Sequence, residues 1–236
     1  MAWSALLDIL YPRACAICGG KVDPSAEYLC WNCLSSFAFV HSPFCSICGD
    51  PIDGKTSGEF QCHYCSSNRP HFDRARSAAR YTGVVQELLR EFKYREGLWA
   101  RRDLAGLLEA CAVAHFDPNE IDAVTYVPLH PVKFRQRGFN QAEALAAILA
   151  KRLRKPLIRR CLIRREYERS QTNLTAKERA TNVKGNFEAI WKRRLRGRGV
   201  MLVDDVMTTG ATVNDCARAL KEAGASRVYV VTVARG

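Results

Sequence analysis

Apolar residues recur along the chain with two alternating spacings, which predict strands and helices in turn. Segments of strand length occur at residues 76–81, 121–127, 200–203 and 227–234. Helical periodicity covers residues 83–94, 98–115, 141–153 and 213–223. Strands that alternate with helices indicate an α/β domain built on a parallel sheet with flanking helices. We expect this domain to occupy residues 71–236.

Residues 1–70 lack this alternation and carry four Cys-x-x-Cys pairs instead. The pairs are Cys15/Cys18, Cys30/Cys33, Cys45/Cys48 and Cys62/Cys65, and the gaps between them are 11, 11 and 13 residues. A two-residue spacer lets both thiolates of a pair reach one ion, and two pairs complete a tetrahedral site. The spacing predicts two structural Zn²⁺ sites in a small zinc ribbon module, because four thiolates leave no open coordination position.

The order in which the four pairs combine has two solutions. The simplest is sequential, with residues 15–33 holding one ion and residues 45–65 the other, and an interleaved pairing is the alternative. Three further cysteines stand alone, Cys111, Cys161 and Cys216. Isolated cysteines of this kind are expected to be small buried apolar residues. Ahead of the module, apolar residues at helical spacing within residues 3–10 predict a short amphipathic helix.

Charge is distributed unevenly over the 236 residues, whose net charge is +12. Residues 151–199 hold seventeen Lys or Arg against four Glu, a net of +13, whereas residues 1–70 carry four against six acids, a net of −2. Such a basic block favours a polyanionic partner, either nucleic acid, a phosphorylated substrate or an acidic membrane surface. A solvated basic surface is the alternative.

The chain also lacks the apolar segments that membrane insertion or secretion would need. No apolar stretch approaches the roughly 18 residues that span a bilayer. Residues 1–10 have no basic start and no small-residue cleavage site, so they do not form a signal peptide. We therefore expect a cytoplasmic protein without a transmembrane segment, whose paired cysteines bind metal rather than form disulfides.

The stretch with the clearest chemistry is residues 199–212, Gly-Val-Met-Leu-Val-Asp-Asp-Val-Met-Thr-Thr-Gly-Ala-Thr. A buried strand is followed by two acids, a loop of small and hydroxyl residues, and a helix. Free backbone N–H groups and the positive end of the helix dipole would meet at that loop and favour an anion. The carboxylates just upstream suit sugar hydroxyls or a divalent metal. An ordinary strand-to-helix turn with a Thr-rich cap is the alternative.

This stretch resembles the signature of the type I phosphoribosyltransferases, which bind phosphoribosyl pyrophosphate (PRPP) with Mg²⁺. The resemblance implies that Asp204 and Asp205 hold the ribose hydroxyls and take part in catalysis. The residues that would surround the 5′-phosphate and complete the PRPP site are Val206, Met207, Thr208, Thr209, Gly210, Ala211 and Thr212.

A second basic loop follows the strand predicted at residues 121–127. Pro128 and Pro131 stiffen it, and the cations Lys133, Arg135 and Arg137 follow. Asn140 is placed to cap the helix that begins at residue 141. A loop at the carboxyl end of a parallel strand is well placed for a ligand anion. In the phosphoribosyltransferases the equivalent loop binds pyrophosphate, so the resemblance assigns that role to these three cations. An exposed basic turn is the alternative.

The segment at residues 164–184 is polar and has no clean period. In transferases of this kind, a loop in this region closes over the substrate. By that resemblance, the four arginines Arg164, Arg165, Arg169 and Arg179 would stabilise charge on the leaving pyrophosphate, and we place Arg179 among the catalytic residues. Arg164 and Arg165, together with Arg135 and Arg137, are equally suited to DNA phosphates. Plain surface charge is the third interpretation.

Several motifs together are similar to the ComF/GntX family, the amidophosphoribosyltransferase-like competence proteins. They are Val127–Pro131 with Arg137–Gln141, the four cysteine pairs, the acidic pair and its loop, and Gln171–Leu174 with Arg179, Asn182–Val183 and Phe187. The likeness covers nearly the whole chain. It implies a cytoplasmic, ComFC-like protein of natural transformation or DNA utilisation that handles incoming single-stranded DNA.

Three functions follow as hypotheses. The first is a DNA-uptake protein that binds PRPP and single-stranded DNA and works with DNA-uptake or recombination machinery. The second is a nucleobase phosphoribosyltransferase of nucleotide salvage, although the residues reveal no base-specific pocket. The third is a non-catalytic adaptor with a PRPP-sensing pocket, in which the zinc module docks a partner.

Overall fold

The structure is a computed structural model, and it describes residues 14–22, 28–52, 54, 58–164 and 185–236. In this part of the chain the main sheet has four strands in the order β1, β6, β5, β2, and all neighbouring pairs are parallel. The strands are β1 (Arg74–Arg80), β2 (Ala123–Tyr126), β5 (Gly199–Met207) and β6 (Arg227–Arg235). The inner strands β5 and β6 are rich in Val, Leu and Met because both of their faces are buried.

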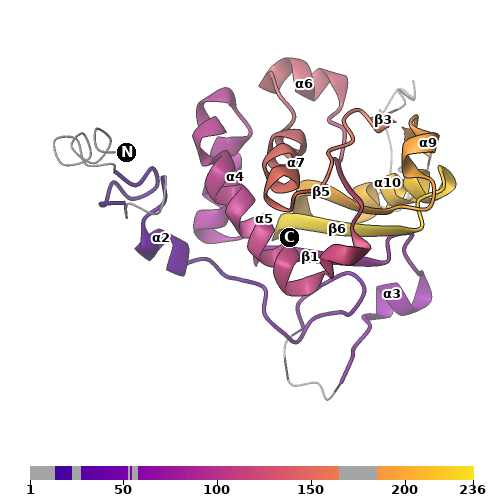
Figure 1. Ribbon diagram of the computed structural model, residues 1–236. Coiled ribbons are helices and arrows are strands. Elements are labelled where there is room, and N and C mark those ends of the chain that lie inside the picture. Colours follow the sequence, from indigo (N-terminus) through magenta and orange to yellow (C-terminus); the bar gives the residue numbers. More distant parts are fainter. Residues whose placement is uncertain (1–13, 23–27, 53, 55–57, 165–184) are drawn as a thin grey trace, which may run out of the picture.

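Helices cover both faces of this sheet (Figure 1). On one face, α5 (Arg101–His115) packs against β1 and β6, and α7 (Gln141–Arg152) packs against β2 and β5. On the other face, α10 (Ala211–Glu222) packs against β5 and β6. Successive side chains of a strand point to opposite faces, so Val203 belongs to the core under α5 and α7, and Leu202 to the core under α10.

Shorter elements complete the described fold. The other helices are α2 (Trp31–Ser35), α3 (His63–Ser67), α4 (Gly83–Phe92), α6 (Pro131–Arg137) and α9 (Lys192–Leu195), with 3-10 turns η1 (Arg95–Ala100) and η2 (Pro118–Glu120). A small antiparallel pair, β3 (Leu162–Arg164) and β4 (Phe187–Ala189), packs against α10. Among the described residues, no helix has the length and apolar character that a membrane crossing requires.

Extended segments outside the four strands pair with both edges of the sheet. Residues 38–40 run antiparallel to β1, where the Val40 N–H donates to Ala78 O at 3.0 Å and the Arg80 N–H donates to Ala38 O at 2.7 Å. Residues 156–158 run beside β2, where the Ile158 N–H donates to Val124 O at 2.8 Å. These pairings satisfy backbone groups that an open edge would leave exposed to other chains.

The cysteine-rich module straddles the sheet at the β1 edge. Figure 1 shows it running beneath the domain from α2 on the left to α3 at the lower right. Its first half, with Val22, Leu29 and Phe37, shares a core with α4 and α5. Its second half, with Ile47 and Cys65, shares a core with α10. The module therefore contributes to the buried cores on both faces, and the boundary near residue 70 stays a prediction.

Most predicted elements are confirmed, and two differ in an instructive way. The helix predicted over residues 98–115 is divided into η1 and α5. The chain turns back sharply at Gly97, whose backbone approaches the end of α4. A Cβ at Gly97 would lie 2.1 Å from Glu91 O. The strand predicted over residues 200–203 continues to Met207, because β6 pairs beside it as far as Arg235. The acidic pair consequently lies inside the strand. Residues 3–10 and 165–184 lie outside the described residues.

Gly199 provides a test of how tightly β5 enters the sheet. A Cβ at this position would lie 1.9 Å from Glu120 O, which is backbone and has little freedom to move. We expect Gly199→Ala to lower the free energy of unfolding by about 1–3 kcal/mol, as overpacking typically does. Urea denaturation followed by circular dichroism measures the change.

Gly106→Ala, within α5, is the matched control. A Cβ at Gly106 would lie 3.3 Å from the tip of the Arg152 side chain, which comes from α7 and is free to shift, unlike backbone. That substitution should be neutral or stabilise by about 0.5–1 kcal/mol through helix propensity. Equal effects of the two substitutions would contradict the interpretation.

Candidate functional site

The turn between β5 and α10 is shaped by glycine. Gly210 is buried, has φ +78°, and a Cβ on it would lie 2.7 Å from Met207 Cε. A left-handed backbone and a close neighbour both favour glycine here. The preceding residues Thr208 and Thr209 are exposed, so the turn presents hydroxyl groups to solvent next to the helix end.

The first turn of α10 presents backbone donors at this turn. The first intrahelical bond runs from the Asn214 N–H to Gly210 O at 2.9 Å. The N–H groups of Ala211, Thr212 and Val213 precede that bond and have no helical carbonyl to bind. Thr209 Oγ1 lies 3.4 Å from the Ala211 N. α10 is twelve residues long, so its dipole adds positive potential where these donors point.

The acidic pair, Asp204 and Asp205, precedes these donors in the sequence and lies in the last part of β5. Asp204 Oδ1 accepts from the Asp205 N–H at 2.9 Å, and Asp205 Oδ1 accepts from the Val206 N–H at 2.8 Å. Burial raises the pKa of Asp204 well above its ordinary value, and the charge of Asp205 raises it further. Two half-buried carboxylates at this position favour a ligand that offers hydroxyl donors or a cation.

The basic loop that the sequence predicts after β2 contains a short helix, α6. His130 caps it by accepting the Val132 N–H on Nδ1 at 3.2 Å, and Gly138 ends it with φ +76°. Lys133 and Arg135 are exposed on α6, whereas Arg137 Nη1 donates to Gln141 Oε1 at 3.0 Å. The helix projects above the domain in Figure 1.

Asn140 holds the two ends of this loop together. As predicted, it caps α7, and its Oδ1 accepts the Ala142 N–H at 3.0 Å. Its Nδ2 also donates to Val127 O at 3.0 Å, at the end of β2. Because β2 pairs in parallel with β5, where Tyr126 lies beside Val203, the basic loop begins at the same edge of the sheet where the acidic pair lies. The structure thus brings these two predicted parts together.

The residues just before β4 are held by a side chain that sequence analysis missed. Asp215 is buried on α10, where its carboxylate accepts the Gly185 N–H at 3.0 Å, the Asn186 N–H at 2.9 Å and the Arg218 Nε at 2.8 Å. The sequence does contain a signal for this residue, because Asp215 occupies a position on the apolar face of an amphipathic helix. Of the predicted arginines, Arg164 lies over the Phe187 ring at 5.5 Å. Arg165, Arg169 and Arg179 lie outside the described residues.

A cavity of about 630 Å³ adjoins the turn between β5 and α10, and the second half of the cysteine module forms its other wall. Thr209–Thr212 line one side, and Tyr64 and Phe72 line the other. Arg235 Nε donates to Asp50 Oδ1 at 2.9 Å and joins the two walls. Sequence analysis did not place the cysteine module beside this turn, because their contact depends on the tertiary fold.

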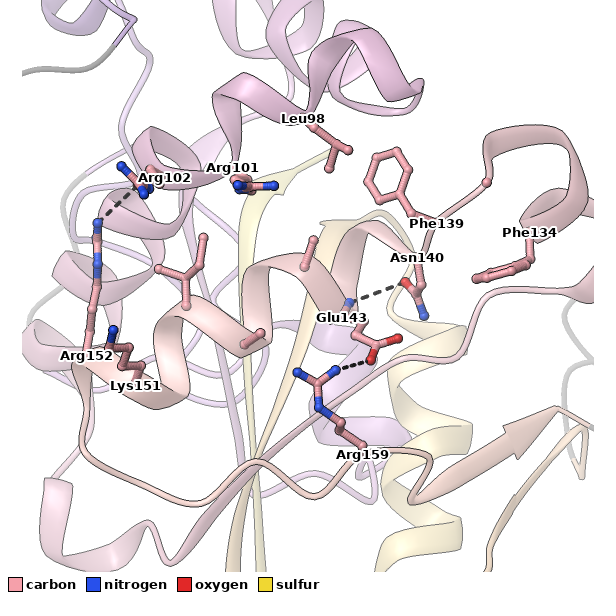
Figure 2. Close-up of a pocket in the computed structure, with 14 residues that line it drawn as sticks. Leu98, Arg101, Arg102, Phe134, Phe139, Asn140, Glu143, Lys151, Arg152 and Arg159 are labelled. Atoms are coloured by element: carbon pink, nitrogen blue, oxygen red, sulfur yellow. Dashed lines mark hydrogen bonds and ion pairs between the residues drawn. The ribbon is translucent and has the colours of Figure 1, made fainter.

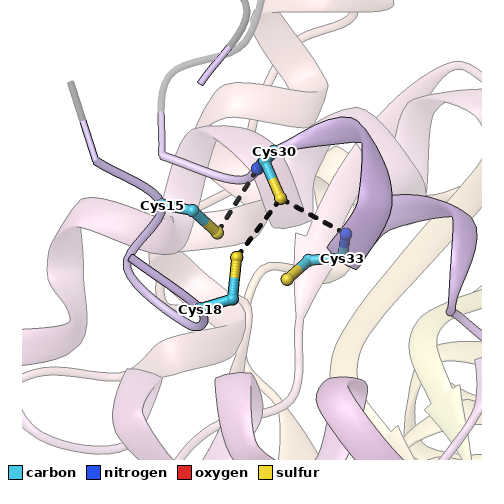
Figure 3. Close-up of side chains that lie close together, drawn as sticks. All are labelled: Cys15, Cys18, Cys30 and Cys33. Atoms are coloured by element: carbon cyan, nitrogen blue, oxygen red, sulfur yellow. Dashed lines mark hydrogen bonds between the residues drawn. The ribbon is translucent and has the colours of Figure 1, made fainter. Parts of the chain in front are cut away.

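The eight paired cysteines form two clusters, and both have the sequential pairing. The sulfur atoms lie within 4.8 Å of one another in each cluster, and the clusters are Cys15/Cys18/Cys30/Cys33 and Cys45/Cys48/Cys62/Cys65. Figure 3 shows the first cluster, in which the four side chains converge on one point. Four thiolates that converge in this way fit a tetrahedral Zn²⁺ site. The interleaved alternative is wrong.

The thiols of each cluster differ in their readiness to ionise. Burial opposes ionisation of Cys15, but backbone donation, led by the Cys30 N–H, lowers the pKa of Cys15 to about 6. Burial and the neighbouring thiols raise the pKa of Cys33. In the second cluster burial again opposes ionisation, but backbone donation, led by the Cys62 N–H, lowers the pKa of Cys45 to about 7. Burial raises the pKa of Cys48 to about 12. A divalent cation would offset the repulsion among four thiolates.

Sheet, turn and cysteine clusters together define the class of protein. The Double zinc ribbon domain family matches residues 6–68, and the Phosphoribosyl transferase domain family matches residues 140–236. The chain therefore combines a double zinc ribbon with a phosphoribosyltransferase domain.

Known proteins are similar to this chain over most of its length. Competence protein F of Haemophilus influenzae is 29% identical over 225 residues, which cover 94% of this chain and 96% of that protein. DNA utilization protein YhgH of Salmonella typhimurium is 28% identical, covering 88% and 96%. Competence protein ComFC of Bacillus subtilis is 27% identical, covering 84% and 80%. These similarities confirm the resemblance to the ComF/GntX family.

The metal sites make a direct prediction of stoichiometry. Purified protein should contain two zinc ions per chain, and Cys18→Ser or Cys48→Ser should each lower the content to one, because each variant breaks one cluster. Metal analysis by mass spectrometry measures this. The buried Cys111 belongs to neither cluster, so Cys111→Ala should retain two ions. A fully loaded Cys48→Ser variant would rule out the assigned ligands.

The raised pKa of Asp204 predicts a stability change with pH. A carboxyl whose folded pKa lies above its unfolded value costs stability as pH rises from the unfolded pKa through the folded one. Asp204→Asn removes this cost, so the ligand-free variant should melt at a higher temperature than the wild type at pH 7. The gap should close below about pH 4, where both states are protonated.

Differential scanning calorimetry across this pH range measures both melting temperatures. Glu87→Gln, on the exposed surface of α4, is the control and should follow the wild type. An Asp204→Asn variant that tracks the wild type at every pH would show that the carboxyl is not held in an unfavourable environment.

Proposed function

We propose that this chain binds PRPP with Mg²⁺ at the carboxyl edge of its sheet. One juxtaposition carries the proposal: the acidic pair of β5, the donors at the start of α10, and the basic loop after β2 leave adjacent parallel strands. Asp204 and Asp205 hold the ribose hydroxyls, directly or through Mg²⁺, and residues 206–212 surround the 5′-phosphate. This division follows from charge, because carboxylates repel phosphate and N–H donors attract it.

The pyrophosphate group belongs on the basic loop in this proposal. Lys133, Arg135 and Arg137 provide cations on α6, which projects from the same edge of the sheet. Arg164 lies at the end of β3, and Arg165 and Arg179 follow in the polar segment, where they would meet charge that develops on a leaving pyrophosphate.

We further propose that the protein acts in DNA uptake or DNA utilisation and handles single-stranded DNA in the cytoplasm. The names of its relatives, competence protein and DNA utilization protein, support this role. The net charge of +13 within residues 151–199 supports a polyanionic partner. Arg135, Arg137, Arg164 and Arg165 are the proposed DNA contacts, and the machinery of DNA uptake or recombination provides the protein partners.

A nucleobase phosphoribosyltransferase is the second candidate. The match to the phosphoribosyltransferase domain favours it, and so do the groups proposed above to bind the sugar and the phosphates. Incubation with PRPP, Mg²⁺ and a panel of free bases distinguishes the transferase from the DNA-handling protein, because a transferase forms nucleotide and releases pyrophosphate. PRPP binding without turnover favours the DNA-handling role or a sensing pocket.

Calorimetric titration of PRPP in the presence of Mg²⁺ tests the site itself. The Asp204→Asn/Asp205→Asn double variant should lose at least about 100-fold in affinity, because each charged hydrogen-bonding group contributes about 1.5–3 kcal/mol. A Glu87→Gln/Glu91→Gln variant makes the same change of charge on the exposed face of α4 and should bind as the wild type does. Equal affinity in the acidic-pair variant would show that the sugar lies elsewhere.

A further inference from the structure

A large hollow on the α5–α7 face is lined by the end of the basic loop and by none of the residues 204–212. It has a volume of about 1000 Å³ and lies between the start of α5, the outer side of α7 and the connection from α6. Five cations line it, and we call it the cationic groove: Arg101, Arg102, Lys151, Arg152 and Arg159. Figure 2 shows Arg101 and Arg102 on α5, Lys151 and Arg152 on α7, Arg159 on the segment before β3, and Phe139 and Phe134 at the other end.

Cations outnumber carboxylates among the described lining residues of the groove, five to one. The one carboxylate is Glu143, which pairs with Arg159. Arg152 Nη1 pairs with Glu109 Oε2 at 3.1 Å just outside the groove. A surface of this kind attracts a polyanion.

Aromatic rings stand at one end of the groove. Phe134 is 48% exposed on α6, an unusual position for a large apolar side chain in a strongly charged setting. Phe139 is half-buried and packs edge-on against Phe92, with ring centroids 5.7 Å apart. The ring of Phe134 is therefore the more accessible to a ligand.

A second hollow continues the groove on the other side of the arginines. Its volume is about 300 Å³, and it shares Leu98, Arg101 and Arg102 with the groove. Tyr28 and Trp99 complete it, with ring centroids 5.4 Å apart. Tyr28 comes from the first zinc ribbon, and its N–H donates to Asp103 Oδ2 at 3.1 Å. The two arginines thus form a cationic ridge with aromatic rings on either side.

Alternating cations and aromatic rings suit one class of polyanion in particular. Unpaired bases stack on aromatic rings while cations bind the phosphates that connect them. In a duplex the bases are already stacked and paired, and an acidic peptide offers no flat rings. The pattern therefore favours a single strand of nucleic acid.

We propose that the cationic groove and the hollow at Tyr28 form the binding surface for single-stranded nucleic acid. The backbone follows Arg101 and Lys151, and bases stack on Phe134 at one end and on the Tyr28–Trp99 pair at the other. The inference rests on the proposed DNA-handling function and extends the contacts proposed at Arg135 and Arg137 on α6 to the neighbouring surface of α5 and α7. The first zinc ribbon then takes part in binding by presenting Tyr28.

Fluorescence anisotropy with a labelled oligothymidylate of about 20 nucleotides, longer than typical single-strand sites, tests the proposal. Arg101→Glu/Lys151→Glu should weaken binding about tenfold or more and reduce the salt dependence of log K by about 1–2, because each lost phosphate contact contributes about 0.7. Phe134→Ala should weaken binding about tenfold through lost stacking, with little change in salt dependence.

A matched patch on α9 provides the controls. Lys192→Glu/Arg193→Glu makes the same change of charge, and Trp191→Ala removes a ring that is 43% exposed. These variants should bind the oligonucleotide as the wild type does. Unchanged zinc content, melting temperature and PRPP affinity in the Arg101/Lys151 variant confirm that the fold is intact, and Arg101→Gln/Lys151→Gln replaces it if charge reversal prevents folding.

The outcomes separate this inference from the proposed function. If the wild type binds the oligonucleotide but the groove and control variants lose affinity equally, the groove assignment is wrong while DNA handling stands. If the wild type binds no oligonucleotide even at low salt, DNA handling fails, and the groove assignment fails with it. If duplex DNA or polyglutamate displaces the oligonucleotide at equal concentration, the groove is a general anion surface and the single-strand proposal is overturned.

Discussion

The parallel hydrogen-bond ladder between β5 and its two neighbours is the constraint on which the rest of the structure depends. It fixes the carboxyl ends of β2, β5 and β6 at one edge, so every group that follows those strands emerges on the same side. Asp204 stays in the ladder beside Thr232, and this pairing holds a carboxylate partly buried at a cost that a ligand can offset. The chemistry of the site is thus a consequence of strand pairing.

The zinc ribbons extend the same sheet instead of forming an independent appendage. Residues 38–40, between the two ribbons, pair with the outer edge of β1 and cover it. Each ribbon contributes to the core on a different face of the sheet. Metal binding therefore has structural consequences on both faces. The second ribbon forms a wall beside the turn at Gly210, and the first presents Tyr28 beside Arg101.

Local patterns predicted much of this arrangement. The period of the apolar residues predicted the strands and helices, the Cys-x-x-Cys spacing predicted two metal clusters, and Asn140 was correctly identified as a helix cap. These predictions succeeded because each depends on residues close together in sequence. The division between η1 and α5 was missed because it depends on the approach of Gly97 to Glu91 O in the return after α4. Asp215 was missed because its partners, Gly185 and Asn186, lie far from it in sequence.

By itself the sequence determined the class of fold, the two cysteine clusters as a set of eight ligands, and the order of strand, loop and helix around Gly210. The tertiary structure alone decided which cysteine pairs combine, which ribbon faces which side of the sheet, and which cations gather around Arg101. Local spacing controls backbone conformation and ligand reach within a few residues. Contacts between distant segments depend on how the whole core packs, and no short pattern encodes them.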